Sequence, residues 1–114
     1  MRKDNIVYAG QMLDMCRKTA DKVGGKSRAE FDRDENLLMA IAHIIQIIGE
    51  AARNVEDDFQ KAHPEIPWAK VIGMRHKVVH DYMDVNYDIV GDVATVEIPS
   101  IVPVLEKIVK PPKQ

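Results

Sequence analysis

The sequence predicts an all-α protein, an antiparallel bundle of four main helices with a short extra helix and a last helix that bends at prolines. In four separate segments, apolar residues recur at the i, i+3, i+4, i+7 spacing of amphipathic helices. No segment alternates apolar and polar residues as a half-exposed strand does, and no Asn-Gly pair marks a tight hairpin. Helices of this kind, joined by short connections, pack as a bundle.

Length and composition are those of one folded domain. The chain has 114 residues, of which 46% are hydrophobic and 30% charged. We expect one helical domain over residues 1–110 and a frayed tail, PPKQ, over residues 111–114. The net charge of −2 does not predict tight binding to long nucleic acid, so we do not expect DNA as a partner, although a local basic cleft stays open.

Neither a membrane span nor a signal peptide is predicted. The longest apolar stretch, Ile41 to Ile48, is too short to span a bilayer. The N-terminal segment has charges on both sides of its apolar residues and no cleavage-site pattern. We therefore expect a cytoplasmic protein. The single cysteine, Cys16, permits no internal disulfide and no cysteine metal cage, and its place among apolar positions indicates packing.

The first two helices have clear limits. Apolar positions from Ile6 to Val23 predict the first helix, which Gly24 and Gly25 end. Ser27 and Glu30 then have the spacing of a capping box, in which each side chain satisfies a free amide of the other. We expect a short helix over residues 27–33.

Two longer segments follow. The segment DENLLMAIAHIIQIIGEAARNVEDDF, residues 34–59, predicts the longest and most buried helix, at the centre of the bundle. HPEIP cannot be regular helix, but Pro67 can open a new one. That helix should run for roughly four turns into GMRHKVVHDYMDVN, residues 73–86. Residues 87–110 predict the last helix, bent or split around Pro99 and Pro103.

The candidate chemistry lies in GMRHKVVHDYMDVN. Five residues of α-helix turn by about 500°, so Arg75 and His80 would leave a straight helix about 140° apart and could not grip one ligand. Two routes could bring them together. The helix could end near His80 and let the histidine turn back, or a second copy could bring its own pair across a two-fold axis.

Arginine and histidine together suit metal-independent cleavage of a phosphodiester. His80 can take a proton from a ribose hydroxyl or give one to a leaving oxygen, while Arg75 can hold the charged phosphoryl oxygens. His76 could orient a phosphate and Asp81 could pair with a neighbouring histidine, or both could be ordinary surface residues. Tyr82 could stack on a base or pack over the helix end.

A metal site is the weaker interpretation of the same residues. His76 and His80 are four residues apart, a spacing that can hold zinc, and Asp81 or Asp84 could add a carboxylate. However, the H-E-x-x-H pattern is absent because Lys77 stands where the glutamate would be. We therefore expect no metal and no cofactor. His43 is expected to be a hydrogen-bonded histidine of the core or the rim rather than a ligand, and His63 is expected in a loop.

Several motifs together resemble a known family. HPEIPWAKVIGMRHKVVHDYMDVN, with IIQIIGEAARNV upstream, is similar to the HepT-like branch of the HEPN superfamily over nearly the whole chain. The hallmark of that family, R-x-x-x-x-H-x-Y, is matched by Arg75, His80 and Tyr82. Further landmarks are IIGEA at Ile47 to Ala51 and PEIPW at Pro64 to Trp68.

The resemblance implies a toxin of a HEPN/MNT toxin–antitoxin pair. Such a toxin is a metal-independent endoribonuclease that cleaves RNA as a homodimer, with both copies of the motif in one cleft. The implied partner is a nucleotidyltransferase (MNT) antitoxin, which transfers AMP from ATP to the motif tyrosine, here Tyr82. Added nucleotides beside Arg75 and His80 would block the cleft with bulk and negative charge.

Two other interpretations remain open from the sequence. The same residues could form a non-catalytic surface that binds a nucleotide or docks the nucleotidyltransferase. Alternatively, the polar cluster could simply cap a helix in a structural protein. Cleavage of RNA by the unmodified dimer would separate the first interpretation from both of these.

Overall fold

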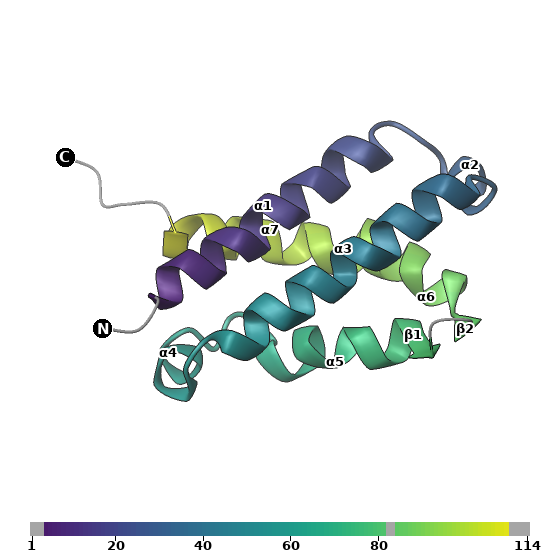
Figure 1. Ribbon diagram of the computed structural model, residues 1–114. Coiled ribbons are helices and arrows are strands. Elements are labelled where there is room, and N and C mark those ends of the chain that lie inside the picture. Colours follow the sequence, from purple (N-terminus) through teal and green to yellow (C-terminus); the bar gives the residue numbers. More distant parts are fainter. Residues whose placement is uncertain (1–3, 82–83, 110–114) are drawn as a thin grey trace.

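Figure 1 shows a computed structural model of the protein, in which residues 4–81 and 84–109 are described. The helices and strands are α1 (Asn5–Val23), α2 (Arg28–Asp32), α3 (Glu35–Asn54), α4 (Asp57–Ala62), α5 (Trp68–Val78), β1 (Val79–Asp81), β2 (Asp84–Val85), α6 (Tyr87–Asp92), the π-helical η1 (Val93–Glu97) and α7 (Ile98–Val109). The predicted all-α bundle is confirmed, with one short hairpin added. The tail at residues 111–114 lies outside the described residues.

Helices α1 and α2 begin and end as predicted. The side chain of Asp4 accepts a hydrogen bond from the amide of Ile6 at the start of α1. Gly24 ends α1 with a φ of 53°, a conformation that favours glycine. At α2 the capping box is complete, with the Glu30 amide donating to Ser27 Oγ at 3.1 Å and the Ser27 amide donating to Glu30 Oε1 at 2.9 Å.

Helix α3 is the central element, as expected. It packs against α1 on one side and α5 on another, and Ile41 and Ile45 are fully buried in the core. By length and composition the whole of α3 could cross a membrane. The stretch Ile41 to Ile48, on which the sequence-based expectation rested, is shorter and did not indicate this. However, 56% of the apolar stretch of α3 is buried inside the protein, as in the core helix of a bundle.

The central helix ends earlier than predicted. It stops at Asn54, because Val55 is extended, and a separate helix α4 starts at Asp57. Glu56, between them, donates its amide to Asn5 Oδ1 at 3.0 Å and accepts from Asn5 Nδ2 at 3.2 Å. Since Asn5 belongs to α1, a tertiary contact stabilises this break.

The helix after HPEIP is also shorter than predicted. It ends at Val78, and the chain then forms β1, which pairs with β2 in an antiparallel hairpin. Val79 pairs with Val85 and Asp81 with Asp84, with an irregular register between them. The sequence pattern predicted no strand, so the hairpin is a correction to the expected fold. Segments of two or three residues are too short for an alternating pattern to show.

The last helical segment is continuous but changes its winding just before Pro99. A π-helical turn, η1, comes directly before α7, in which Pro99 is the second residue and Pro103 is internal. In a regular α-helix the Pro99 ring would clash with the carbonyl of Thr95, four residues earlier. The wider turn therefore lies where the proline would otherwise strain the helix.

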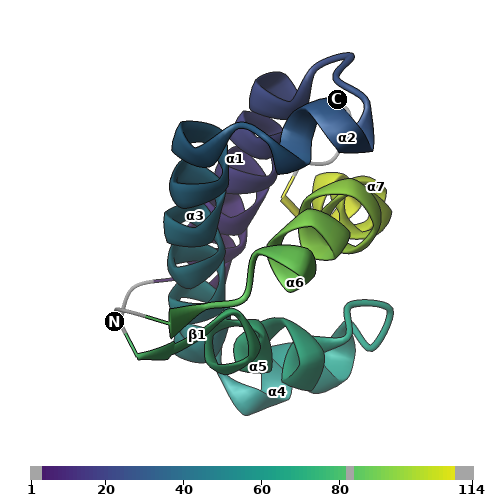
Figure 2. The same cartoon turned by 90° about the vertical axis from the view of Figure 1, so that its right-hand side faces the viewer.

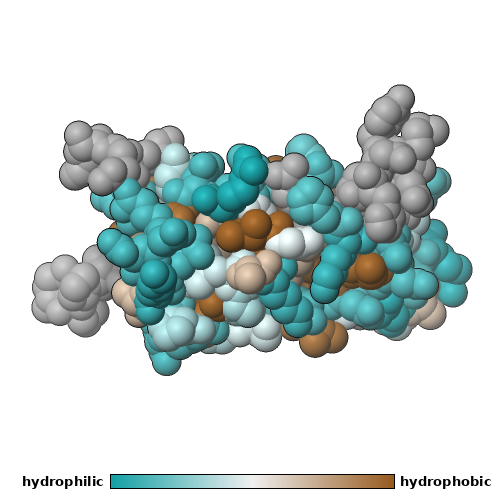
Figure 3. Space-filling model, turned by 90° about the horizontal axis from the view of Figure 1, so that it is seen from below, coloured by the Kyte–Doolittle hydropathy of each residue, from teal (hydrophilic) through white to brown (hydrophobic). Residues whose placement is uncertain are grey.

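Seen along the bundle, α5 and α6 lie on the same side of the molecule, beside α3 (Figure 2). The side viewed in Figure 3 is mostly hydrophilic, with hydrophobic residues in separate patches. This arrangement leaves the outer side of α5 open and puts the hairpin at the opposite end of α5 from α4 (Figure 1).

Candidate functional site

The candidate site is built at the C-terminal end of α5. Arg75 lies in the last turn of this helix, and His80 lies in the middle of β1, two residues beyond the helix end. The angle of about 140° applies only to a helix that continues through His80. Because the helix ends at Val78, that restriction on the pair no longer holds, and the first of the two predicted routes fits the backbone.

Not every predicted site residue is described in full. For Arg75, His80 and Asp81 the structure describes the backbone, and Tyr82 lies outside the described residues. Asp81 ends β1 and pairs with Asp84 of β2. The hairpin therefore brings the backbone of Asp81 next to that of Asp84.

The outer side of α5 is open around the motif. His76 is exposed, and so is Lys77, which has no ion pair with another described residue. A Cβ atom added at Gly73 would meet nothing within 4 Å. The side chain of Met74, in contrast, is buried in the core. A ligand that reaches the end of α5 would therefore meet an imidazole and an ammonium group from the solvent side.

A small cavity of about 190 Å³ lies between α5 and the helical segment that follows the hairpin. Its lining comes from Lys70, Met74 and Lys77 of α5, Ile89 and Asp92 of α6, and Val93 and Glu97 of η1. None of these residues was predicted from the sequence as a site residue. Lys70 and Lys77 are seven residues apart, a spacing that puts both on one side of the helix. This spacing is the sequence signal that could have indicated a basic lining here.

Two ion pairs hold the carboxylates of this cavity. Lys70 Nζ lies 2.8 Å from Glu97 Oε1, and Arg28 Nη1 lies 3.0 Å from Asp92 Oδ1. Arg28 also donates to Asp32 Oδ1 at 2.9 Å, and these hydrogen bonds, first to Asp32 and then to Asp92, raise the pKa of Arg28. The guanidinium thus ties α2 to the wall of the cavity.

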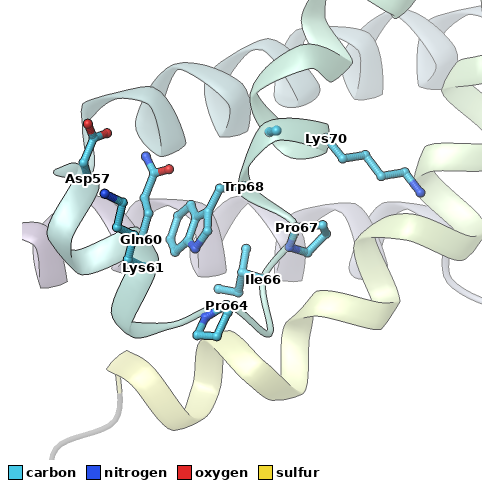
Figure 4. A pocket seen from close by; sticks show the side chains of 9 residues that line it. Asp57, Gln60, Lys61, Pro64, Ile66, Pro67, Trp68 and Lys70 are labelled. Carbon is cyan, nitrogen blue, oxygen red and sulfur yellow. The ribbon is translucent and has the colours of Figure 1, made fainter.

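A second, wider cavity of about 530 Å³ lies at the opposite end of α5 (Figure 4). Trp68, Ile66, Pro64 and Pro67 form much of its lining, beside side chains of α4. The indole of Trp68 is buried and donates from Nε1 to the carbonyl oxygen of His63 at 2.9 Å. This hydrogen bond explains the PEIPW landmark as a packing unit that fixes the start of α5.

The remaining histidines lie away from the motif in sequence. His43 is exposed on α3, so of the two expected positions the rim is correct and the core is not. His63 caps the end of α4, where its ring lies 4.5 Å from that of Phe59. Within residues 4–81 and 84–109, as far as side chains are described, no group of three or more His, Cys, Asp or Glu residues could hold a metal ion.

Comparison with known proteins identifies a family whose model this chain matches over most of its length. Residues 12–108 match the model of the family described as "Ribonuclease HepT-like". A protein of Caldanaerobacter subterraneus subsp. tengcongensis, named as a candidate RNase, is 37% identical over 90% of this chain and 88% of its own length. A candidate ribonuclease HepT of Thermococcus cleftensis is 36% identical over 71% of this chain and 74% of its own length.

Similarity extends to archaeal relatives over almost the full chain. A candidate RNase of Methanocaldococcus jannaschii is 28% identical over 96% of this chain and 90% of its own length. No solved structure matches the chain significantly. The family is thus identified from sequence, and the geometry of the site comes from this structure.

Proposed function

Because this chain belongs to the HepT-like ribonuclease family of HEPN proteins, we propose that it is a metal-independent endoribonuclease whose Arg75 and His80 cleave RNA. One observation carries the assignment of these residues. Helix α5 ends at Val78, so Arg75 belongs to a helix and His80 to the strand that follows it. This arrangement removes the geometric objection that a continuous helix would raise.

The chemistry follows from the two side chains. Arg75 binds the phosphoryl oxygens through its planar fork and stabilises the charge that develops during cleavage. His80 transfers the proton, from the attacking 2′-hydroxyl or to the leaving 5′-oxygen. His76 and Asp81 are auxiliary: His76 adds a donor on the open side of α5, and Asp81 adds a carboxylate next to His80 in the chain.

The proposed biological setting is a HEPN/MNT toxin–antitoxin pair. The toxin acts as a homodimer, and the nucleotidyltransferase partner inactivates it by transferring AMP to Tyr82. Tyr82 follows His80 by two residues, so an AMP group there would bring negative charge and bulk to the place where the RNA phosphate binds. This chemistry supports a regulatory role for Tyr82.

RNA cleavage in EDTA tests the core of the proposal. The purified protein should cut RNA in the presence of the chelator, and His80→Ala should lose the activity with an unchanged circular-dichroism spectrum. His63→Ala is the matched control, since His63 packs on Phe59 beside α4. Equal cutting by the His80→Ala protein would reject the assignment. No cutting by the unmodified protein would favour the alternative in which the same residues form a non-catalytic surface that binds a nucleotide or docks the nucleotidyltransferase.

Mixing two inactive variants tests the dimer. If the cleft combines Arg75 of one copy with His80 of the other, mixed dimers of Arg75→Ala and His80→Ala proteins regain one complete site. Random exchange should then restore about a quarter of the wild-type activity. No recovery, despite exchange of subunits shown by native mass spectrometry, would mean that no complete site forms from one residue of each copy.

The intact mass tests regulation. Incubation with the nucleotidyltransferase and ATP should add AMP units to the protein, and peptide mapping should place them on Tyr82. Tyr82→Phe removes the acceptor hydroxyl, so its mass should stay constant under the same conditions. AMP transfer to the Tyr82→Phe protein would contradict the proposed acceptor.

A further inference from the structure

The cavity between α5 and α6 is large enough to hold one aromatic ring. Its volume is about 190 Å³, and an apolar cavity of about 150 Å³ is known to accommodate benzene. Met74 and Val93 are buried in its lining, and Ile89 packs partly against the core. A flat ring therefore has room here and apolar surface to stack on.

The polar groups of the lining add hydrogen-bond acceptors. Glu97 uses Oε1 to bind Lys70, and Asp92 uses Oδ1 to bind Arg28. The second oxygen of each carboxylate has no hydrogen-bond partner among the described residues. Each carboxylate is thus held in place by a cation and keeps one oxygen available to accept a hydrogen bond from a ligand.

The charge of Lys77 is available to a phosphate. Lys77 is exposed at the C-terminal end of α5 and makes no ion pair with another described residue. His80 follows it by three positions, so their Cα atoms lie at most about 11 Å apart. A short run of nucleotides can cover that distance, so one strand of RNA could reach the cavity and the motif together.

We propose that the cavity lined by Lys70, Met74, Lys77, Ile89, Asp92, Val93 and Glu97 binds one base of single-stranded RNA that carries an exocyclic amino group. Stacking on the apolar lining binds the ring, and Glu97, the more buried of the two carboxylates, accepts a hydrogen bond from the amino group, as acidic side chains do from N4 of cytosine. Lys77 binds a flanking phosphate. The inference deepens the proposed function, on which it rests, by naming a base-selective subsite.

Cytosine and uracil give the sharpest comparison. Both are pyrimidines of nearly equal size, but position 4 carries an amino donor in cytosine and a carbonyl acceptor in uracil. A carboxylate accepts a hydrogen bond from the amino group of cytosine, but it faces another acceptor in the carbonyl oxygen of uracil. The site should therefore prefer cytosine by about fivefold, the lower end of the discrimination seen for side-chain contacts to bases.

The experiment measures binding with probes that cannot be cleaved. Fluorescein-labelled 2′-O-methyl oligocytidine and oligouridine of equal length are titrated with the full-length protein, and fluorescence anisotropy gives Kd at several salt concentrations. The 2′-O-methyl group removes the hydroxyl that would attack the phosphate. Wild-type protein should bind oligocytidine about fivefold more tightly than oligouridine.

Two variants with matched controls separate the base contact from the phosphate contact. Glu97→Gln should lose the preference for oligocytidine, because an amide offers a donor as well as an acceptor. Glu106→Gln is its control, since Glu106 is also ion-paired, with Arg17 at 3.0 Å. Lys77→Gln should weaken both probes equally and lower the salt slope by about 0.7, whereas Lys22→Gln in α1 should change neither.

The outcomes are distinct from those of the cleavage assay. Equal affinity for the two probes, no binding at all, or a preference that survives in Glu97→Gln would overturn the base site, whether or not the protein cuts RNA. Conversely, a Glu97-dependent preference for cytosine in a protein that cuts no RNA would support the base site and reject the proposed ribonuclease activity.

Discussion

The guanidinium of Arg28 lies directly over the backbone of Gly91, in the space that a side chain at this position would occupy. A Cβ atom at Gly91 would lie 2.6 Å from both Cζ and Nε of Arg28, closer than side chains approach one another. From this position Arg28 reaches Asp92 in α6 and the carbonyl oxygen of Asp88 at 3.2 Å. Glycine at position 91 therefore permits the contact between α2 and α6.

The first prediction concerns the coupling between these two residues. Gly91→Ala should displace Arg28 and break its contacts with α6, while alanine gains up to about 1 kcal/mol of helix propensity over glycine. Because exposed ion pairs contribute only about 0.2–1 kcal/mol, the free energy of unfolding should change by less than about 1 kcal/mol. Urea denaturation of a double-mutant cycle measures the coupling.

The cycle also contains its own control. Arg28→Ala should lower the stability of the wild-type protein and have almost no effect in the Gly91→Ala background, where the contacts with α6 are already lost. If Arg28→Ala costs the same in both backgrounds, the glycine is not what permits the contact.

The second prediction concerns the buried thiol. Cys16 is fully buried, and burial raises the pKa of the Cys16 thiol from 9.0 to about 12. The unfolded chain therefore releases this proton first as the pH rises. The free energy of unfolding should therefore fall between pH 9 and pH 12. The contribution of Cys16 to this fall is at most about 1.4 kcal/mol per pH unit.

Comparison with Cys16→Ala isolates this contribution from other groups that titrate at high pH. The alanine variant should be less stable at pH 7, and its stability should decline less steeply above pH 9. In addition, a thiol reagent should label wild-type Cys16 only as fast as the protein opens. Identical pH slopes for the two proteins would contradict the prediction.

The third prediction concerns the central helix. Ile45 is fully buried in α3, whereas Met39 on the same helix is 56% exposed. Ile45→Ala should lower the free energy of unfolding by about 2–5 kcal/mol, because it removes buried surface and leaves a cavity. Met39→Ala should change it by less than about 0.5 kcal/mol, so that a similar loss in both variants would contradict the assignment of α3 as the core helix.

Local signals in the sequence predicted the parts of the fold that local contacts determine. The capping box of Ser27 and Glu30 and the helix stop at Gly24 depend on residues within four positions of one another. The break after Asn54 depends instead on Asn5 contacting Glu56 from another helix. No pattern within the central segment could reveal that contact.

The same distinction applies to the candidate site. The sequence predicted Arg75 and His80 from their residue types and the family motif, but it extended their helix too far. Lys70 and Glu97 contact each other across 27 positions and, with Met74 and Asp92, line a cavity that exists only once α5 packs beside α6. The periodicity of a sequence indicates on which side of its helix a residue lies. It does not determine which side of one helix packs against which side of another.

The last prediction compares two prolines that should respond in opposite directions to the same substitution. Pro103 lies inside α7, where it cannot donate to the carbonyl of Pro99. Pro103→Ala restores that donor, which stabilises the helix. The substitution also frees the unfolded chain from the restriction that proline imposes, which opposes part of this gain. The free energy of unfolding should still rise by about 1–2 kcal/mol.

Pro67, in contrast, directly precedes α5, and its carbonyl oxygen accepts the amide of Val71 at 2.9 Å. Its fixed φ suits the start of a helix, where the missing amide costs nothing. Pro67→Ala should therefore lower the free energy of unfolding, by about 0.4–1 kcal/mol, because the unfolded chain gains freedom. Urea denaturation of both variants measures the two signs, and a loss of stability in Pro103→Ala would show that α7 depends on its proline for a reason other than backbone hydrogen bonding.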